Sequence, residues 1–295
     1  MNFIVRIKTM VIKKIHIFCL AFFLSSQIES SSIEKVTYSA WDSADVDLLY
    51  VLPSKINSDT KVLFIIHGNS RDANKYLSLW MKDAKNKNVI LVAPQFKKNE
   101  HPYYQTLGMA TFSGKAINNE DKWLRNSIAN FFSFFKNKHN LTSNKYRIYG
   151  FSGGSQFVHR YMMYGSDRGI EKAAIGSAGW YTFIDKKPYP YGIENMPLEQ
   201  GRIEWLMSLE VLFLLGDKDD DPNHSSLNTS KGSMLQGSNR FERGNNYFDH
   251  LIKIGNDFQS PLRWRYSVIK GADHDTKKMT KPAIEFLLRD LEYED

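Results

Sequence analysis

Short apolar segments with the composition of buried strands recur along this 295-residue chain, and segments that could form helices separate them. Residues 62–66 (VLFII) and 89–93 (VILVA) contain only apolar side chains, which is typical of strands covered on both faces. Other strands are expected at 35–39, 47–52, 146–149, 173–177, 211–215 and 265–269, the first two as an antiparallel pair. Helices are expected at 73–85, 121–138 (capped by Asn119), 156–164, 241–254 and 281–291. This alternation predicts an α/β fold: a mostly parallel central sheet of about eight strands with helices on both faces.

The first thirty residues differ in composition from the rest of the chain. Basic residues precede the apolar run 15–24 (IHIFCLAFFL), and the Ser-rich segment SSQIESSS follows it. This order is typical of a secretory signal peptide, and the run is shorter than the roughly 20 apolar residues that span a bilayer. We therefore expect a signal peptide at 1–30, one domain at 31–295 without a membrane span, and a secreted or periplasmic location. An uncleaved membrane anchor is the alternative.

Cysteine content and net charge argue against disulfides in the mature chain and against a nucleic-acid partner. Cys19 is the only cysteine and lies inside the expected signal, so the mature chain would contain no disulfide. Without residues 1–30 the chain has 35 Lys and Arg against 31 Asp and Glu, which lowers the formal net charge from +7 to +4. No block of basic residues stands out, and we therefore expect no nucleic-acid partner.

Residues 146–154 (YRIYGFSGG) place the pattern G-x-S-x-G, centred on Ser152, directly between an expected strand and an expected helix. A serine presented by a tight strand-to-helix turn needs strained backbone angles and closely packed neighbouring chains. Gly150 and Gly154 allow both, because they have no side chains. The pattern predicts that Ser152 is a nucleophile, and the alternative is an ordinary polar residue in a turn.

A nucleophilic serine needs a base that accepts its proton and a carboxylate that orients this base. Among eight histidines, His274 alone follows the last expected strand, on the Gly-containing loop KGADH. His159 is expected to be a packed core residue, and His67 belongs to a different loop. We therefore predict that His274 is the base.

The carboxylate is expected in the acidic segment 216–222 (GDKDDDP), which follows another strand. Asp217, Asp219 and Asp221 are the candidates, and their alternate spacing also resembles a calcium-binding loop. Such a loop would have Gly where Pro222 stands and Glu where Asn228 stands, so the sequence argues against calcium. The order Ser, Asp, His, each after a strand, is the order of one large class of hydrolases.

Cleavage of an acyl bond places negative charge on the carbonyl oxygen, and fixed backbone N–H groups can stabilise that charge. One predicted donor is Gly153, which follows the nucleophile. The other is expected on the loop 67–70 (HGNS), which comes directly after an expected strand, with Asn69 as the donor.

Two segments, 181–205 and 222–240, fit the alternation poorly and are rich in Pro, Gly, Asn and Tyr. Long loops in a domain are usually functional, and both of these follow strands. Four aromatic residues in or beside the first segment are expected to line an apolar acyl or aryl pocket, namely Trp180, Tyr181, Tyr189 and Tyr191. The alternative is that they pack in the core.

With these residues assembled, the chain resembles the α/β-hydrolase superfamily, and within it exported bacterial hydrolases related to esterases and polyhydroxybutyrate depolymerases. The similar segments are HGNSRDANKY (67–76), GFSGGSQFVHRYM (150–162), GWYT (179–182), PYG (190–192), GDKDDDPN (216–223) and GADHD (271–275). The resemblance implies an α/β-hydrolase fold and selects Asp219 as the acid, three residues after Gly216. Depolymerases of this group often contain disulfides and a polymer-binding module, and the lack of both here argues against a polymer as substrate.

The predicted function is hydrolysis of carboxylic esters through an acyl-enzyme on Ser152, without a metal ion or an organic cofactor. The expected partner is a small-molecule ester or, as for the depolymerases, a polymeric one. Two alternatives stay open: a peptidase or amidase with the same fold and triad, and an inactive binding protein on a hydrolase scaffold.

Overall fold

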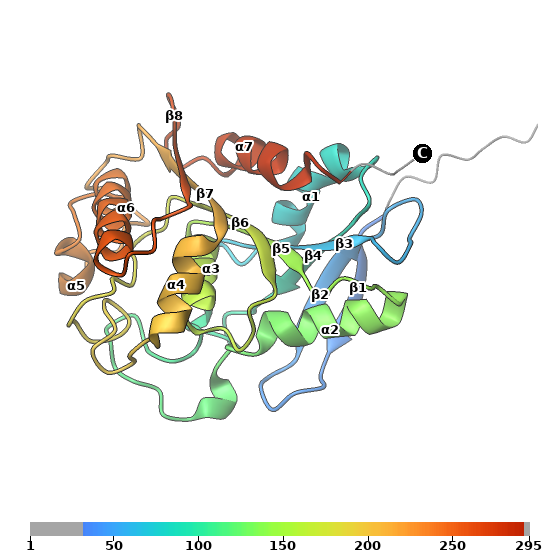
Figure 1. The fold of residues 1–295 in the computed structure, drawn as a ribbon, viewed down its shortest axis with the longest axis horizontal. Helices are drawn as coiled ribbons and strands as arrows, with labels where there is room; N and C mark the ends of the chain where they lie inside the picture. The colour runs from blue at the N-terminus through green and yellow to red at the C-terminus, as the bar shows by residue number, and fades with distance from the viewer. Residues whose placement is uncertain (1–31, 292–295) are drawn as a thin grey trace, which may run out of the picture. The chain divides into compact units, whose positions relative to one another are not determined.

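The computed structural model describes residues 32–291, in which eight strands form a single sheet (Figure 1). The expected signal peptide at 1–30 lies outside the described residues. The strands are β1 (Glu34–Tyr38), β2 (Val46–Val51), β3 (Lys61–Ile66), β4 (Val89–Gln95), β5 (Tyr146–Phe151), β6 (Ile170–Gly176), β7 (Glu210–Gly216) and β8 (Arg265–Ile269).

The strand order is β1-β2-β4-β3-β5-β6-β7-β8. β2 pairs antiparallel with both β1 and β4, and every other pairing is parallel. The expected mostly parallel sheet with an opening antiparallel pair is therefore confirmed. Because β3 and β5 to β8 run in one direction, their carboxyl ends meet at the same edge of the sheet, where ligands bind in open α/β folds.

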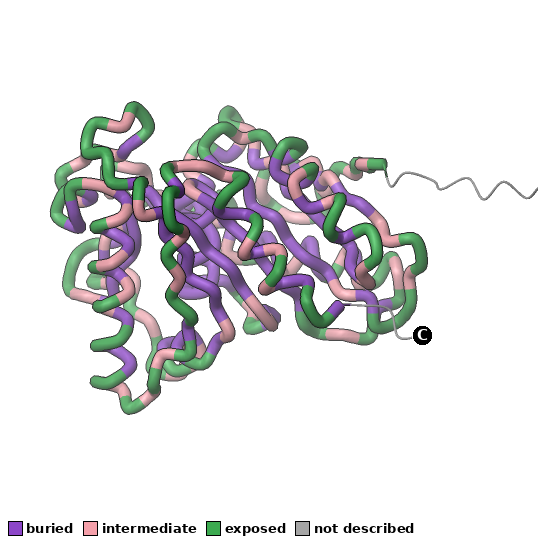
Figure 2. The backbone as a smooth tube through the Cα atoms, turned by 90° about the horizontal axis from the view of Figure 1, so that it is seen from above, coloured by how far each residue is buried: buried purple, intermediate pink, exposed green. Residues whose placement is uncertain are grey.

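Helices cover both faces of the sheet (Figure 1). On one face lie α1 (Ala73–Ala84) and α7 (Thr276–Leu288), and on the other lie α2 (Ser127–His139), α3 (Gly153–Tyr164), α4 (Gln200–Ser208) and α6 (Arg240–Asp257). The alternation of β3 shows how one strand serves both layers: Leu63 and Ile65 pack towards α1, and Phe64 and Ile66 towards α2 and α3. Figure 2 shows the strands as a buried band between partly exposed helices.

Several expected helix boundaries are wrong. The helix expected at 121–138 is a short 3-10 turn, η2 (Glu120–Lys122), followed by α2 from Ser127, so Asn119 caps the turn and not the helix. α3 begins three residues earlier than expected, directly after Ser152. α7 begins at Thr276 and not at residue 281 as expected, because the Asp275 side chain accepts hydrogen bonds from the Lys277 and Lys278 amides.

The two segments expected as long loops contain short helices. α4 begins at Gln200, inside 181–205, and the single-turn α5 (Lys231–Met234) lies inside 222–240. Another 3-10 turn, η1 (Tyr104–Thr106), follows β4. No helix within residues 32–291 is long and apolar enough to cross a membrane.

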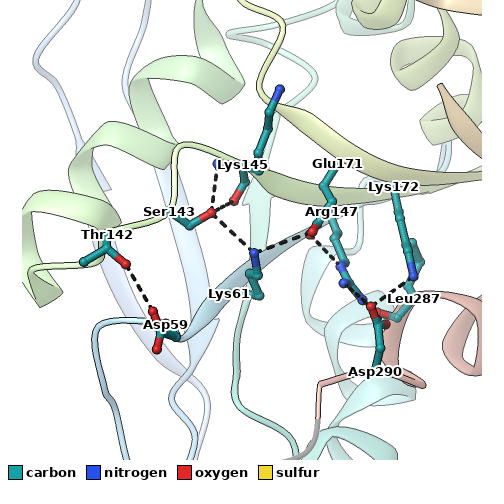
Figure 3. A network of polar contacts seen from close by, with 10 residues as sticks. All are labelled: Asp59, Lys61, Thr142, Ser143, Lys145, Arg147, Glu171, Lys172, Leu287 and Asp290. Atoms are coloured by element: carbon teal, nitrogen blue, oxygen red, sulfur yellow. Dashed lines mark hydrogen bonds and ion pairs between the residues drawn. The ribbon is translucent and has the colours of Figure 1, made fainter. Parts of the chain in front are cut away.

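A polar network fastens the end of α7 to the amino-terminal part of β5 and β6 (Figure 3). Arg147, the second residue of β5, is 1% exposed and donates to both carboxylate oxygens of Asp290, at 2.7 and 2.8 Å. It also donates to the Leu287 carbonyl and to Glu171 on β6. Because these residues lie near the starts of the strands, the network is far along β5 from Ser152.

Candidate active site

Ser152 lies in a strained turn between β5 and α3. Its φ of +55° and ψ of −117° are sparsely populated for a residue with a side chain. A Cβ atom at Gly150 would lie 2.3 Å from the Gly154 carbonyl oxygen, and one at Gly154 would lie 2.1 Å from the Ile66 carbonyl oxygen. Both glycines of G-x-S-x-G are therefore needed for the close packing that holds this turn.

Three side chains from the ends of three strands meet at this turn. The Ser152 Oγ lies 2.9 Å from the His274 Nε2, on the loop after β8. The His274 Nδ1 lies 2.7 Å from the Asp219 Oδ2, on the loop after β7. The residues predicted as nucleophile, base and acid thus form one continuous hydrogen-bonded chain across 122 residues of sequence.

The structure separates the three candidate acids. Asp219 is buried against His274, with 3% of its side chain exposed. Asp217 instead accepts a hydrogen bond from the Gly271 amide, so it joins the two loops without touching the imidazole. Asp221 is exposed and accepts from the Asn223 amide. Across residues 32–291, no three His, Cys, Asp or Glu side chains are grouped to hold a metal ion.

The surroundings set the charge states of the pair. Burial alone would raise the pKa of the Asp219 carboxyl, but the hydrogen bond from His274 and the charge of Arg240 outweigh it, and the pKa is lowered. Burial lowers the pKa of His274 below its ordinary value, and the nearby Asp219 carboxylate only partly opposes this. An ionised Asp219 beside a neutral His274 is the state in which His274 can accept a proton.

The Asn69 and Gly153 amides lie side by side next to Ser152. A Cβ atom at Gly153 would lie 3.0 Å from the Asn69 nitrogen. Neither amide donates to a protein acceptor anywhere in residues 32–291. Two unpaired N–H groups beside a nucleophile are suited to bind a carbonyl oxygen that gains negative charge.

Residues that sequence reasoning missed hold the Asn69 loop in place. The Tyr104 hydroxyl donates to the His67 carbonyl, at 2.8 Å. The Gln105 side-chain Nε2 donates to the Asn69 Oδ1, at 3.1 Å. Both come from η1, and nothing in the sequence around them indicates that this turn packs against the loop after β3.

The other two histidines discussed above have structural contacts. His159 is fully buried, as expected, with its Nδ1 on the Ser155 carbonyl and its Nε2 accepting from the Thr182 amide. His67 is also buried, and its Nε2 accepts from the Phe96 amide.

The aromatic residues expected to line a pocket are mostly packed inside the protein. Tyr181 has no exposed surface and stacks on Tyr247, with ring centroids 4.4 Å apart. Trp180 is 1% exposed and contacts both the Arg160 guanidinium and the Tyr191 ring. Tyr189 is buried too, and only Tyr191 is partly exposed. Trp180 and Tyr181 therefore follow the core-packing alternative: neither presents surface to a ligand in this structure.

Arg240 is a further residue at the site that sequence reasoning missed. Its guanidinium Nη1 lies 3.1 Å from the Asp219 Oδ1, the carboxylate oxygen that His274 does not use. The two residues are 21 positions apart. Because the segment between them is irregular, the spacing of apolar residues does not predict that they are in contact.

A mostly parallel eight-stranded sheet, a strained serine after its β5 strand and helices on both faces define the α/β-hydrolase fold. The chain has this fold, as the resemblance implied.

Comparison with known proteins finds similar solved structures but no matching family model or curated sequence. Among solved structures, the chain is similar to poly(aspartic acid) hydrolase-1 from Sphingomonas sp. KT-1, at 26% identity and a TM-score of 0.80 over 88% of this chain and 99% of that one. It is also similar to a poly(3-hydroxybutyrate) depolymerase from Bordetella parapertussis, at 21% identity and a TM-score of 0.80 over 90% and 92% of the two chains.

A more distant similarity, at 14% identity and a TM-score of 0.56, covers 87% of this chain and 98% of a fluorophosphonate-binding serine hydrolase from Staphylococcus aureus. The expected resemblance to polyhydroxybutyrate depolymerases and to esterases is confirmed, because structures of both kinds match the chain.

Proposed function

We propose that this chain is a serine hydrolase that cleaves carboxylic ester bonds through an acyl-enzyme intermediate. Ser152 is the nucleophile, His274 the general base and acid, and Asp219 the carboxylate that orients His274. The observation that carries the proposal is the continuous chain of contacts from the Ser152 Oγ through both imidazole nitrogens to Asp219.

In the first step, the Ser152 Oγ attacks the ester carbonyl carbon while its proton passes to the His274 Nε2. Asp219 stabilises the resulting imidazolium through its contact with Nδ1. The carbonyl oxygen becomes an oxyanion and accepts hydrogen bonds from the Asn69 and Gly153 amides. The bond to the leaving alcohol then breaks, and the alcohol takes the proton from His274.

In the second step, water attacks the acyl group on Ser152 and gives a proton to His274. The ester bond to Ser152 breaks, and His274 returns that proton to the serine oxygen. His274 performs every proton transfer in this cycle, so the scheme uses neither a metal ion nor an organic cofactor.

The substrate in this proposal is a small-molecule or polymeric ester, and no nucleic acid takes part. The proposal also includes export to the periplasm or the medium, with residues 31–295 as the catalytic domain. The basic, apolar and Ser-rich order of residues 1–30 supports export.

A second candidate function is amide hydrolysis by the same residues. It is favoured by the similarity at 26% identity to a hydrolase named for poly(aspartic acid), a polymer joined by amide bonds. An amide requires that His274 protonate a poorer leaving group, so the two candidates differ in the proton transfer that ends the first step.

A substrate panel tests the proposal and separates the candidates. It contains p-nitrophenyl esters of increasing acyl length, a polyester film, a peptide anilide and poly(aspartic acid), each assayed with wild type and with Ser152→Ala. We expect ester cleavage by wild type and a loss of roughly 10³-fold or more in the variant. Faster cleavage of the anilide or of poly(aspartic acid) would select amide hydrolysis. A folded wild-type protein that cleaves nothing would indicate the inactive binding protein instead.

A further inference from the structure

Arg240 is a buried cation that contacts the carboxylate of the proposed triad from behind. It is the first residue of α6 and is 2% exposed. Its Nη1 lies 3.1 Å from the Asp219 Oδ1, and its Nη2 donates to the Ser226 hydroxyl at 2.9 Å. The amide of the next residue, Phe241, donates to the main-chain carbonyl of Asp219 at 3.1 Å.

These contacts divide the Asp219 carboxylate between two partners. Oδ2 faces His274, and Oδ1 faces Arg240. A guanidinium has only donors, so Arg240 adds to the stabilisation that His274 gives the ionised Asp219, and it holds the plane of the carboxylate. An unpaired arginine buried here would be strongly unfavourable, which means that the carboxylate and the guanidinium depend on each other.

Arg240 also contacts the loop that carries His224, a neighbour of the proposed base. Ser226, which accepts from Arg240, is two residues from His224, and the ring centroids of His224 and His274 are 5.7 Å apart. One side chain therefore connects the proposed acid, the start of α6 and the loop beside the proposed base.

We propose that Arg240 is a positioning residue for the Asp219–His274 pair, which fixes the carboxylate and extends the activity of the base to lower pH. This inference rests on the proposed function, because it concerns the same triad. Arg240 lies behind Asp219 and does not touch Ser152, so its effect on substrate passes through the pair.

The charges around His274 give the direction of the effect. Burial lowers the pKa of His274, the Asp219 carboxylate raises it, and the charge of Arg240 and the neighbouring His224 lower it further. Asp273 on the same loop and Lys278 on α7 are exposed and pair with each other, so salt screens them. Asp275 is half-buried and accepts hydrogen bonds from the Lys277 and Lys278 amides at the start of α7. Removal of Arg240 takes away a positive charge and frees Asp219 to interact more strongly with the imidazole. Both changes raise the pKa of His274.

The test compares the pH dependence of kcat/KM on a p-nitrophenyl ester in wild type, Arg240→Met and Arg240→Lys. Arg240→Met keeps an unbranched apolar stem without the guanidinium and its charge. We expect its acid limb to move up by roughly 0.5 to 1.5 pH units and kcat to fall roughly 10- to 100-fold, with KM nearly unchanged. Arg240→Lys keeps the charge but not the planar fork, so its acid limb should stay within about 0.3 units of wild type while kcat falls.

Arg243 supplies a matched control one turn along α6. It is equally buried and donates to the Gly237 and Gly179 carbonyls, without contact to Asp219. We expect Arg243→Met to lower the melting temperature as much as Arg240→Met does, and to leave the pH of the acid limb where it is in wild type.

The outcomes separate this inference from the proposed function. If Ser152→Ala abolishes activity but Arg240→Met folds and keeps the wild-type acid limb and kcat, the role of Arg240 is wrong and the triad stands. If Arg240→Met does not fold, Arg240→Lys decides: a wild-type kcat overturns the positioning role, and a reduced kcat with an unmoved acid limb supports it. If Ser152→Ala keeps its activity, the proposed function itself fails.

Discussion

Replacement of Asp219 by Asn tests the geometry of the site through the tautomer of His274. Asn has one acceptor oxygen and one donor amide group in place of two acceptor oxygens. Because Arg240 can only donate, it will attract the Asn oxygen to the position of Oδ1, which directs the amide group at the His274 Nδ1. Nδ1 must then accept, so the ring proton moves to Nε2, and His274 can no longer take the proton of Ser152.

The loss can be estimated from this change. The variant keeps the Ser152 turn and the two amides, but it loses both the base and the charge that stabilises the imidazolium, so kcat/KM should fall roughly 10³- to 10⁴-fold, or about 4 to 5.5 kcal/mol of transition-state stabilisation. The assay is ester hydrolysis at pH 7.5, with circular dichroism to confirm folding.

Asp217→Asn and Asp221→Asn are the controls for this prediction. Both lie on the same loop, and neither contacts His274, since they accept from the Gly271 and Asn223 amides. They should lose less than about tenfold. If Asp219→Asn kept more than a tenth of wild-type activity, or if Asp217→Asn lost as much, the assignment of the acid would be refuted.

Three further predictions follow from the same structure. Gly154→Ala should destabilise the protein by roughly 2 to 4 kcal/mol, because the new Cβ would lie 2.1 Å from a main-chain oxygen. Gly201→Ala in α4 is the control: the nearest atom to its new Cβ is 3.6 Å away, so it should be neutral or slightly stabilising, and thermal melts compare the two variants. Arg147→Met should lower the free energy of unfolding at pH 7 by roughly 2 kcal/mol, since Asp290 and Glu171 are partly solvated, and should leave kcat/KM at the wild-type value (Figure 3). In wild type, the hydrogen bond from Arg147 holds the pKa of the Asp290 carboxyl below its ordinary value. The stabilisation is therefore present above the pKa of Asp290 in the unfolded chain and is lost as the pH falls through its pKa in the folded protein. Urea titrations in which wild type and Arg147→Met differ equally at neutral and at strongly acidic pH would refute this. Because the pKa of His274 is lowered, the acid limb of kcat/KM in wild type should lie below pH 6.5, and a limb above that value would contradict the burial argument.

The sequence predicts those parts of this fold that depend on buried apolar runs. β3 and β4 are recognisable because every residue in their centres must be apolar on both faces. The same strands predict that Ser152, Asp219 and His274 lie close together, since the carboxyl ends of the parallel strands before them meet at one edge of the sheet. The resemblance was still needed to choose Asp219 among its neighbours.

The sequence does not predict the features that depend on helix capping and on tertiary contacts. The apolar pattern predicts a helix from Asp121, but residues 120–122 form a 3-10 turn, and the helix starts only at Ser127. The apolar period of a helix does not define its first turn, which is set by local hydrogen bonds. Arg240 was missed because its partner is reached across an irregular loop. Tyr181 lies in the core and not in a pocket, and the sequence leaves both open because it does not distinguish an aromatic ring in a cleft from one in the core.

The most direct test of the central claim is to react the folded protein with a fluorophosphonate and to locate the adduct by mass spectrometry of its peptides. The account predicts one adduct, on Ser152, which forms in wild type and in Asp217→Asn and is largely lost in Asp219→Asn. An adduct on a different serine, or none in a folded wild-type protein, would contradict it.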